Sequence, residues 1–116
     1  MEQPITIPKY LKDLINQIFE IEKKASKIDG HSIHRNINKI KDIFENELSE
    51  AHRITYSNPL GEAYNETRTD CDASIAGEST EDLIITEVIK PIIQISKDGV
   101  SFIAQKGVVI VESKKN

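Results

Sequence analysis

The sequence predicts an α+β protein in which a helical hairpin comes first and a small, mostly antiparallel β domain follows. Up to about Tyr56 the apolar residues recur three and four positions apart, a spacing typical of amphipathic helices. After about Leu83 they come in short runs rich in Ile and Val, separated by turn residues, as in strands. The change of period divides the chain of 116 residues into an expected helical stem, residues 1–57, and an expected β domain, residues 58–116.

The first helix is expected over about residues 8–29. Pro8 indicates its start, because a proline in the first turn of a helix gives up no hydrogen bond. The following apolar residues step by three and four, and the positions between them are mostly polar or charged. These apolar positions are Leu11, Leu14, Ile18, Ile21, Ala25 and Ile28. The pattern predicts one apolar stripe and one solvated face.

The second helix is expected over about residues 32–54. The step from Ile28 to Ile33 is five residues, so a continuous helix would rotate its apolar stripe at this point. A turn at Asp29-Gly30 restores the alignment, because Gly readily ends a helix. The second stripe consists of Ile33, Ile37, Ile40, Phe44, Leu48 and Ala51.

Two apolar stripes can close on each other, or they can meet the same pair from a second chain in a four-helix bundle. The apolar content of 38% is low for a chain that buries its core alone, and it favours burial against a second copy. We therefore expect a homodimer. The residues expected at the dimer contact are Leu11, Leu14, Ile18, Ile21, Ile33, Ile37, Ile40 and Phe44.

The β domain is expected to begin after a stop at Pro59 and Gly61. Cys71, Ala73 and Ile75 alternate with polar residues and could form a first strand. Four further strands are expected over residues 83–89, 92–95, 100–104 and 108–111. The Asp98-Gly99 pair between two of these runs is a strong signal for a hairpin turn.

Composition excludes several classes of function. The net charge is −4 and no basic stripe occurs, so a nucleic-acid partner is not expected. The single cysteine cannot form an internal disulfide bond. The N-terminus lacks the pattern of a signal peptide, and no apolar run has the length of a membrane span. A soluble cytoplasmic protein without a membrane partner is the expectation.

No catalytic motif, metal site or cofactor site is expected. Cys71, His52 and Asp72 are the only weak catalytic candidates, and no recognisable geometry joins them. His31 and His34 have a spacing that could offer two ligands to a metal ion, but no third ligand lies at helical spacing. Solvated histidines near the start of a helix are the preferred interpretation, and the chain is expected not to be an enzyme.

An acidic segment lies in the first half of the expected β domain. Between Glu62 and Glu87 eight acidic side chains accompany one basic side chain, Arg68. Such a run is commonly a solvated loop. It could also cover a basic site on a partner, in which case binding would weaken steeply with salt.

From Leu48 onward the chain resembles the C-terminal part of the GrpE family of nucleotide-exchange factors. The resemblance rests on a helix expected to end at Ile54, on the Pro59, Gly61, Tyr64 and Asn65 series, and on three later motifs. These motifs are Asp72-Ala73, Glu87-Val88-Ile89 and Val108-Val109-Ile110-Val111. The family usually has a histidine where this chain has Cys71, and its long N-terminal paired helix is much shorter here.

The resemblance implies a dimeric cochaperone with a helical bundle and a small β domain. Its expected partner is the ATPase domain of a DnaK-type chaperone, from which it would promote nucleotide release without any catalytic residue or cofactor. The residues expected to bind the partner are Tyr64, Lys90, Phe102, Gln105 and Lys106. The alternative is an adaptor or immunity-type interaction protein that acts through the acidic segment 62–87.

Overall fold

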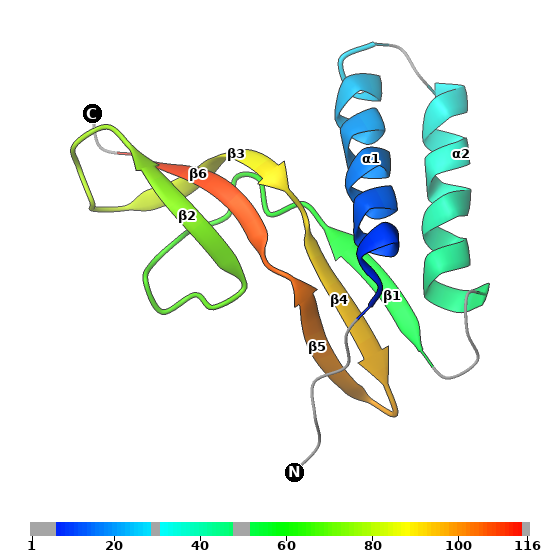
Figure 1. The fold of residues 1–116 in the computed structure, drawn as a ribbon. Helices are drawn as coiled ribbons and strands as arrows, with labels where there is room; N and C mark the ends of the chain where they lie inside the picture. Colours follow the sequence, from blue (N-terminus) through cyan, green and yellow to red (C-terminus); the bar gives the residue numbers. More distant parts are fainter. Residues whose placement is uncertain (1–6, 29–30, 48–51, 115–116) are drawn as a thin grey trace.

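The computed structural model describes residues 7–28, 31–47 and 52–114, and within them the chain has the expected α+β class (Figure 1). Two helices come first and form a hairpin. Six strands follow in two small sheets of three strands each. We call the sheet of β1, β4 and β5 sheet A, and the sheet of β2, β6 and β3 sheet B. In Figure 1 the helices lie beside sheet A, and sheet B extends away from them.

The two helices begin close to the expected positions. Helix α1 spans Lys9–Ala25, and the Pro8 carbonyl accepts the backbone N–H groups of Leu11 and Lys12, as expected of a proline at a helix start. Helix α2 spans His31–Asp42 and continues as a wider π-helical turn, η1, over Ile43–Glu47. The turn expected at Asp29-Gly30 lies outside the described residues.

The prediction that the second helix continues to residue 54 is wrong at its end. Arg53–Ser57 is a strand, β1, which pairs antiparallel with β4, Ile92–Lys97. The pattern of burial explains this, because Ile54 is buried while Arg53 and Thr55 are exposed. This alternation has the period of a strand rather than of a helix. The first strand therefore lies within the expected helical stem.

Sheet A is entirely antiparallel, in the order β1-β4-β5. Strand β5 spans Val100–Gln105, and the hairpin expected at Asp98-Gly99 joins it to β4. Both turn residues have positive φ, 52° for Asp98 and 79° for Gly99, which suits the tight turn that matches the twist of a hairpin. The hairpin prediction is confirmed.

Sheet B is mixed rather than antiparallel. Its strands are β2, Cys71–Ala76, β3, Leu83–Lys90, and β6, Gly107–Ser113. The central strand β6 pairs parallel with β2 and antiparallel with β3. The sequence predicted one small sheet, whereas the chain passes from sheet B to sheet A at Pro91 and returns to sheet B at Gly107.

Gly107 is required where the two sheets meet. A Cβ atom at this position would lie 2.9 Å from Cγ1 of Ile92 and 3.3 Å from Sγ of Cys71. The first distance is too short for any real contact between carbon atoms. A glycine therefore allows strand β6 to begin directly against strands β2 and β4.

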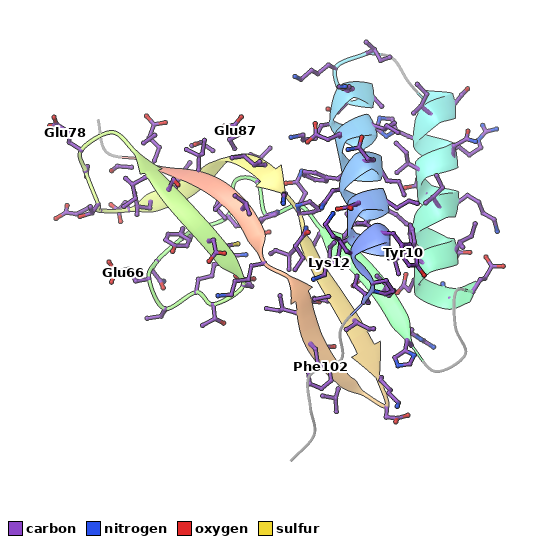
Figure 2. The ribbon with its side chains drawn as sticks, in the orientation of Figure 1. Tyr10, Lys12, Glu66, Glu78, Glu87 and Phe102 are labelled. Atoms are coloured by element: carbon purple, nitrogen blue, oxygen red, sulfur yellow. The ribbon has the colours of Figure 1, made fainter. Side chains whose placement is uncertain are left out.

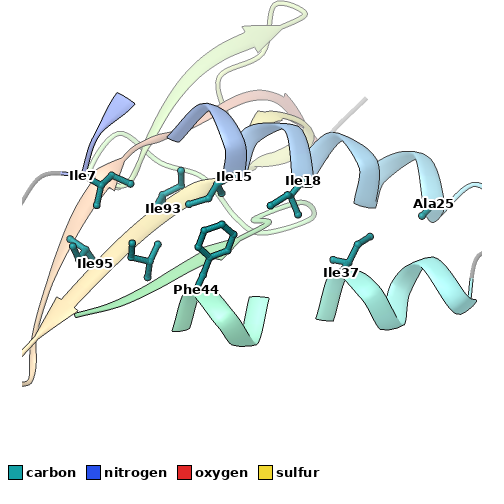
Figure 3. Packing of buried hydrophobic residues seen from close by; sticks show 9 residues of the cluster. Ile7, Ile15, Ile18, Ala25, Ile37, Phe44, Ile93 and Ile95 are labelled. Atoms are coloured by element: carbon teal, nitrogen blue, oxygen red, sulfur yellow. The ribbon is translucent and has the colours of Figure 1, made fainter. Parts of the chain in front are cut away.

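Helix α1 packs into two separate cores. The first core lies between the helical hairpin and sheet A, with Ile15 completely buried (Figure 3). The second covers the inner face of sheet B, and Phe19 of α1 is completely buried in it. The first core consists of Ile7, Ile15, Ile18, Ala25, Ile37, Phe44, Ile54, Ile93 and Ile95. The second consists of Phe19, Cys71, Leu83, Ile85, Val88, Ile92, Val109 and Val111.

Candidate functional site

The solvent side of the helical hairpin carries an exposed apolar stripe, which we call the hairpin face. Its side chains are between 38% and 70% exposed, although they are large and apolar. They come from α1, from the turn that follows it, and from α2 with its last turn. The hairpin face comprises Tyr10, Leu14, Ile21, Ile28, Ile33 and Ile43. An apolar surface of this kind on a helix pair is typical of a protein contact.

The eight residues expected at a dimer contact divide into three groups. Ile18, Ile37 and Phe44 are buried in the first core, so they are not available to a second copy. Leu11 and Ile40 are partly buried and pack against that core. Leu14, Ile21 and Ile33 belong to the hairpin face. Some residues of the two predicted apolar stripes thus pack the hairpin against sheet A, and others remain exposed to solvent.

Sheet B has a second exposed surface, its outer face, on the side away from the second core. On β6, Val109 and Val111 are buried inside, so Val108 and Ile110 between them lie on the outer face, where they are half-buried. The register places Asp72 and Lys90 on either side of Val108, and Glu87 beside Ile110. The outer face is therefore an apolar centre with charged residues around it.

All but the first of the segments that carry the GrpE resemblance meet on sheet B. The first, the helix expected to end at Ile54, is instead replaced there by strand β1 of sheet A. Asp72-Ala73 lies in β2, Glu87-Val88-Ile89 in β3 and Val108–Val111 in β6. The segment from Pro59 to Asn65 runs along β3, where the Gly61 and Tyr64 N–H groups donate to Ile85 and Leu83 carbonyls. Residues scattered over about fifty positions of sequence thus converge on one sheet.

The five residues expected to bind a partner do not form one cluster. Lys90 and Lys106 are exposed near the same end of the outer face, and Nζ of Lys106 lies 3.8 Å from Oδ1 of Asp72. Tyr64 packs against the second core and Phe102 against the first core. Gln105 is half-buried and faces helix α1. Only the two lysines lie where a partner on the outer face would reach them.

Gln105 belongs to a junction between helix α1 and the two sheets. Its side-chain amide and that of Asn16 donate to each other, over 2.9 Å and 3.0 Å. The Gln105 amide also donates to the Pro91 carbonyl over 3.0 Å. A second link comes from Lys23, whose ammonium donates to the Val88 carbonyl over 3.0 Å. The first bonds hold α1 against the end of β5 in sheet A and against the crossover at Pro91, and the Lys23 bond ties α1 directly to β3 of sheet B.

A further polar cluster joins α1, α2 and β1. The Tyr56 hydroxyl donates to the Glu22 carboxylate over 3.3 Å, and Nζ of Lys41 lies 2.8 Å from the same carboxylate. The Lys41 ammonium also sits 4.8 Å from the centroid of the Tyr56 ring, within range of a cation–π interaction. Burial, with the nearby Glu22 charge, raises the pKa of Tyr56 well above its usual value. The negative charge of Glu22 is compensated by Lys41 and by the Tyr56 hydrogen bond. We therefore interpret this cluster as a structural contact between the two helices and β1.

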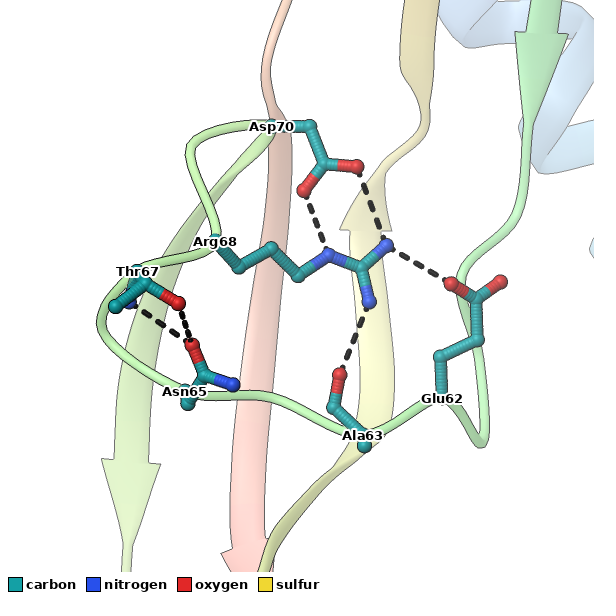
Figure 4. A network of polar contacts seen from close by, with 6 residues as sticks. All are labelled: Glu62, Ala63, Asn65, Thr67, Arg68 and Asp70. Atoms are coloured by element: carbon teal, nitrogen blue, oxygen red, sulfur yellow. Dashed lines mark hydrogen bonds and ion pairs between the residues drawn. The ribbon is translucent and has the colours of Figure 1, made fainter.

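Arg68 draws part of the acidic segment together (Figure 4). Its guanidinium donates to Asp70 over 2.6 Å and 3.3 Å, to Glu62 over 2.8 Å and to the Ala63 carbonyl over 3.0 Å. The hydrogen bond from Arg68 lowers the pKa of Asp70 below its usual value. Arg68 therefore compensates Glu62 and Asp70, and the acidic residues farther along the segment are not its partners.

The weak catalytic candidates form no nucleophilic site. Cys71 is a buried free cysteine, and burial, together with the Asp70 charge, raises the pKa of its thiol. A raised pKa disfavours the reactive thiolate. Within residues 7–28, 31–47 and 52–114 no three His, Cys, Asp or Glu side chains gather as a metal site would require. In the same ranges neither helix is long and apolar enough to cross a bilayer.

Comparison of the chain with protein-family models, with curated proteins and with solved structures finds no significant match.

Proposed function

We propose that this chain is a non-enzymatic, GrpE-like cochaperone that promotes nucleotide release from the ATPase domain of a DnaK-type chaperone. The observation that carries the proposal is the convergence of the resemblance on sheet B. Its motifs supply all three strands of that sheet and the segment beside β3. Motifs that are far apart in the sequence could therefore contribute to one surface that binds a partner.

The outer face of sheet B is the proposed contact with the ATPase domain. Val108 and Ile110 supply an apolar centre, and Lys90, Glu87 and Asp72 supply charges at its rim. This is the usual composition of a protein contact, in which an apolar centre gives affinity and charged rim residues give orientation. A factor of this kind needs no catalytic group. It releases nucleotide by binding the open, nucleotide-free conformation of its partner more tightly than the closed one.

The proposal includes a homodimer formed through the hairpin face. Helix α1 has 17 residues and is therefore about 25 Å long, so a face two helices wide covers roughly 500 Å² per chain. Two such faces bury about 1,000 Å² in total, which reaches the lower limit of specific protein interfaces. A second copy of the chain is the natural occupant, because both helices leave large apolar side chains exposed and these would meet an identical set in a four-helix bundle.

The rate of nucleotide release tests the proposed function. A DnaK-type chaperone is loaded with a fluorescent nucleotide, and its release is followed by stopped-flow fluorescence with and without this protein. We expect an acceleration of tenfold or more, and a loss of roughly fivefold in Lys90→Glu, because a reversed rim charge weakens association. Lys97→Glu, on an exposed position of sheet A, should retain the wild-type effect. Unchanged release at saturating protein would refute the proposal.

Mass measurement tests the dimer separately. Light scattering at micromolar concentration should give twice the mass of one chain for the wild type. Leu14→Glu with Ile21→Glu should give the mass of one chain, because charges would then lie at the centre of the contact. Asn38→Glu, which adds a charge at an exposed position of α2 outside the hairpin face, should remain dimeric.

The second candidate, an interaction protein that acts through the acidic segment 62–87, is favoured by one observation. Glu66 and Glu78 are exposed at the end of sheet B that lies away from the helices (Figure 2). For neither carboxylate is an ion pair recorded among the described residues. This candidate predicts partner binding that fails when these carboxylates are neutralised and that does not depend on Lys90.

A further inference from the structure

Strand β3 pairs with β6 through two irregularities, each of the kind called a β-bulge. One lies between Ile85 and Glu87, and the other lies between Val88 and Lys90. In a bulge two successive residues of one strand lie opposite a single residue of the neighbouring strand, and a side chain is turned in a new direction. Two bulges in a strand of eight residues therefore change which of its side chains are buried.

The burial pattern of β3 shows the effect of the bulges. In a regular strand every second side chain lies on one face, so the buried Ile85 would be followed by buried residues at positions 87 and 89. The next buried residue is instead Val88, and the two residues after it are exposed. Ile89 is 46% exposed, and Lys90 is exposed beside it. The bulges therefore bring an apolar and a basic side chain to the surface as neighbours.

Ile89 and Lys90 extend the outer face of sheet B at the end where β6 begins. Val88 is on the inner face, so the residue that follows it lies on the other side of the sheet. Lys90 is the register partner of Val108, which belongs to the outer face. Within the described residues the Lys90 ammonium has no ion pair, and it remains available to a carboxylate of a partner. An exposed apolar side chain beside such a charge is a common composition of a protein contact.

We propose that Ile89 is the apolar anchor of the contact with the ATPase domain, and that the partner surface has an apolar pocket for Ile89 beside a carboxylate for Lys90. This inference rests on the function proposed above and adds the chemistry of the surface that the outer face recognises. Burial of the exposed part of Ile89 supplies affinity. The pair between Lys90 and the carboxylate supplies orientation and speeds association. The bulges hold both side chains on a paired strand, which positions them more precisely than a loop would.

Ile75 of β2 is a matched control for Ile89. Both isoleucines belong to sheet B, and both are 46% exposed. Ile75 is the register partner of the buried Val111, so it lies on the inner face rather than on the outer face. Serine at either position removes a similar exposed apolar area, and the two substitutions should have similar, small effects on stability. The two variants therefore differ mainly in the face that they change.

Nucleotide release from the loaded chaperone, followed at increasing concentrations of each variant, tests the inference. Ile89→Ser should raise the concentration that gives half of the maximal acceleration about fivefold, because about half of an isoleucine side chain no longer becomes buried. Ile75→Ser should raise it by less than about twofold, because its side chain lies outside the contact. Urea denaturation should give similar midpoints for both variants. Equal effects of the two variants on release would overturn the inference and leave the proposed function intact. No acceleration by the wild type would refute the proposed function, and this inference with it.

Sodium chloride separates the two parts of the contact. The loss in Ile89→Ser should be similar at low and high salt, whereas the loss in Lys90→Glu should shrink as salt is raised, because exposed charges are screened. A loss in Lys90→Glu that does not depend on salt would contradict the carboxylate assigned to the partner.

Methyl resonances of the labelled wild-type protein give a result that does not depend on the folding of any variant. On addition of the unlabelled ATPase domain, the methyl resonances of Ile89 should shift or broaden, and those of Ile75 should remain unchanged. The reverse pattern, or unchanged Ile89 resonances at saturating ATPase domain, would contradict the anchor role.

Discussion

The two sheets of this protein have the same number of strands but differ in what covers them. One face of sheet A lies under the helical hairpin, and Ile93 at its centre is completely buried. Among the described residues, sheet B receives one buried apolar side chain from the helices, Phe19, and it leaves Ile75 exposed on its inner face. We therefore propose that the two sheets have different roles. Sheet A and the helical hairpin stabilise the fold, and sheet B provides the surfaces that bind a partner.

The largest expected effect contrasts a buried with an exposed isoleucine. Ile93→Ala in sheet A should lower the free energy of unfolding by about 2–5 kcal/mol, because it leaves a cavity in a closed core. Ile75→Ala in sheet B should change it by less than about 0.5 kcal/mol, because its environment is already open to water. Urea denaturation measures both values. Similar losses for the two variants would remove the contrast between the sheets.

An intermediate effect concerns the junction where helix α1 meets the crossover between the two sheets. Asn16→Ala should destabilise the protein by about 1–2 kcal/mol, because the half-buried Gln105 loses its reciprocal partner. In a double-mutant cycle with Gln105→Ala the two losses should not add, since both variants break the same pair. Asn38→Ala, at an exposed position of α2, provides the control.

The same pair distinguishes two roles for Gln105. If Gln105 orients sheet B, Asn16→Ala and Gln105→Ala should reduce nucleotide release by similar factors. If Gln105 contacts the chaperone directly, as the sequence suggested, only Gln105→Ala should reduce it. Additive stability losses combined with an effect of Gln105→Ala alone would contradict the orienting role.

The smallest expected effect concerns the acidic segment and depends on pH. Because Arg68 lowers the pKa of Asp70, the ionised carboxylate stabilises the folded state above the unfolded pKa, near 3.8. This contribution is lost as pH falls through the lower pKa of the folded state. The wild type should exceed Asp70→Asn in stability by about 0.5–1 kcal/mol at neutral pH, the range of a partly exposed ion pair.

Urea midpoints at pH 7 and at successively lower pH values measure that difference. The advantage of the wild type should remain constant down to about pH 5 and should shrink once the pH falls below 3.8. Glu78→Gln, in the exposed loop after β2 and outside the Arg68 hydrogen bonds, is the matched control for the removal of one acidic charge. If the stability advantage of the wild type over Asp70→Asn increased as the pH was lowered, the proposed role of the Arg68–Asp70 pair would be contradicted.

Much of the fold could be predicted from local patterns. The strand at Cys71–Ala76, the hairpin at Asp98-Gly99 and the later strands all follow from short-range alternation and turn residues. Strand β1 was missed because a pattern of threes and fours runs up to it. Its own signal was the alternation of Ile54 and Tyr56 with polar neighbours, which is short and was outweighed by the longer helical pattern.

The division into two sheets and the position of Gln105 could not be predicted in this way. Both depend on contacts between residues far apart in sequence, such as the 89 positions between Asn16 and Gln105. Nothing in the sequence around Gln105 indicates that its side chain forms hydrogen bonds with a residue of the first helix. The apolar stripe of the first helix likewise did not show which of its residues would be buried. Ile18 packs in the first core, whereas Ile21, within one helical turn, is exposed to solvent.

The most direct test of the division between the sheets is an NMR titration of the labelled protein with the ATPase domain of a DnaK-type chaperone. Amide resonances of Val108, Ile110 and Lys90 on the outer face of sheet B should shift or broaden, while those of Thr55, Gln94 and Ser101 in sheet A remain unchanged. Perturbations centred on sheet A, or no perturbation at saturating ATPase domain, would contradict the account.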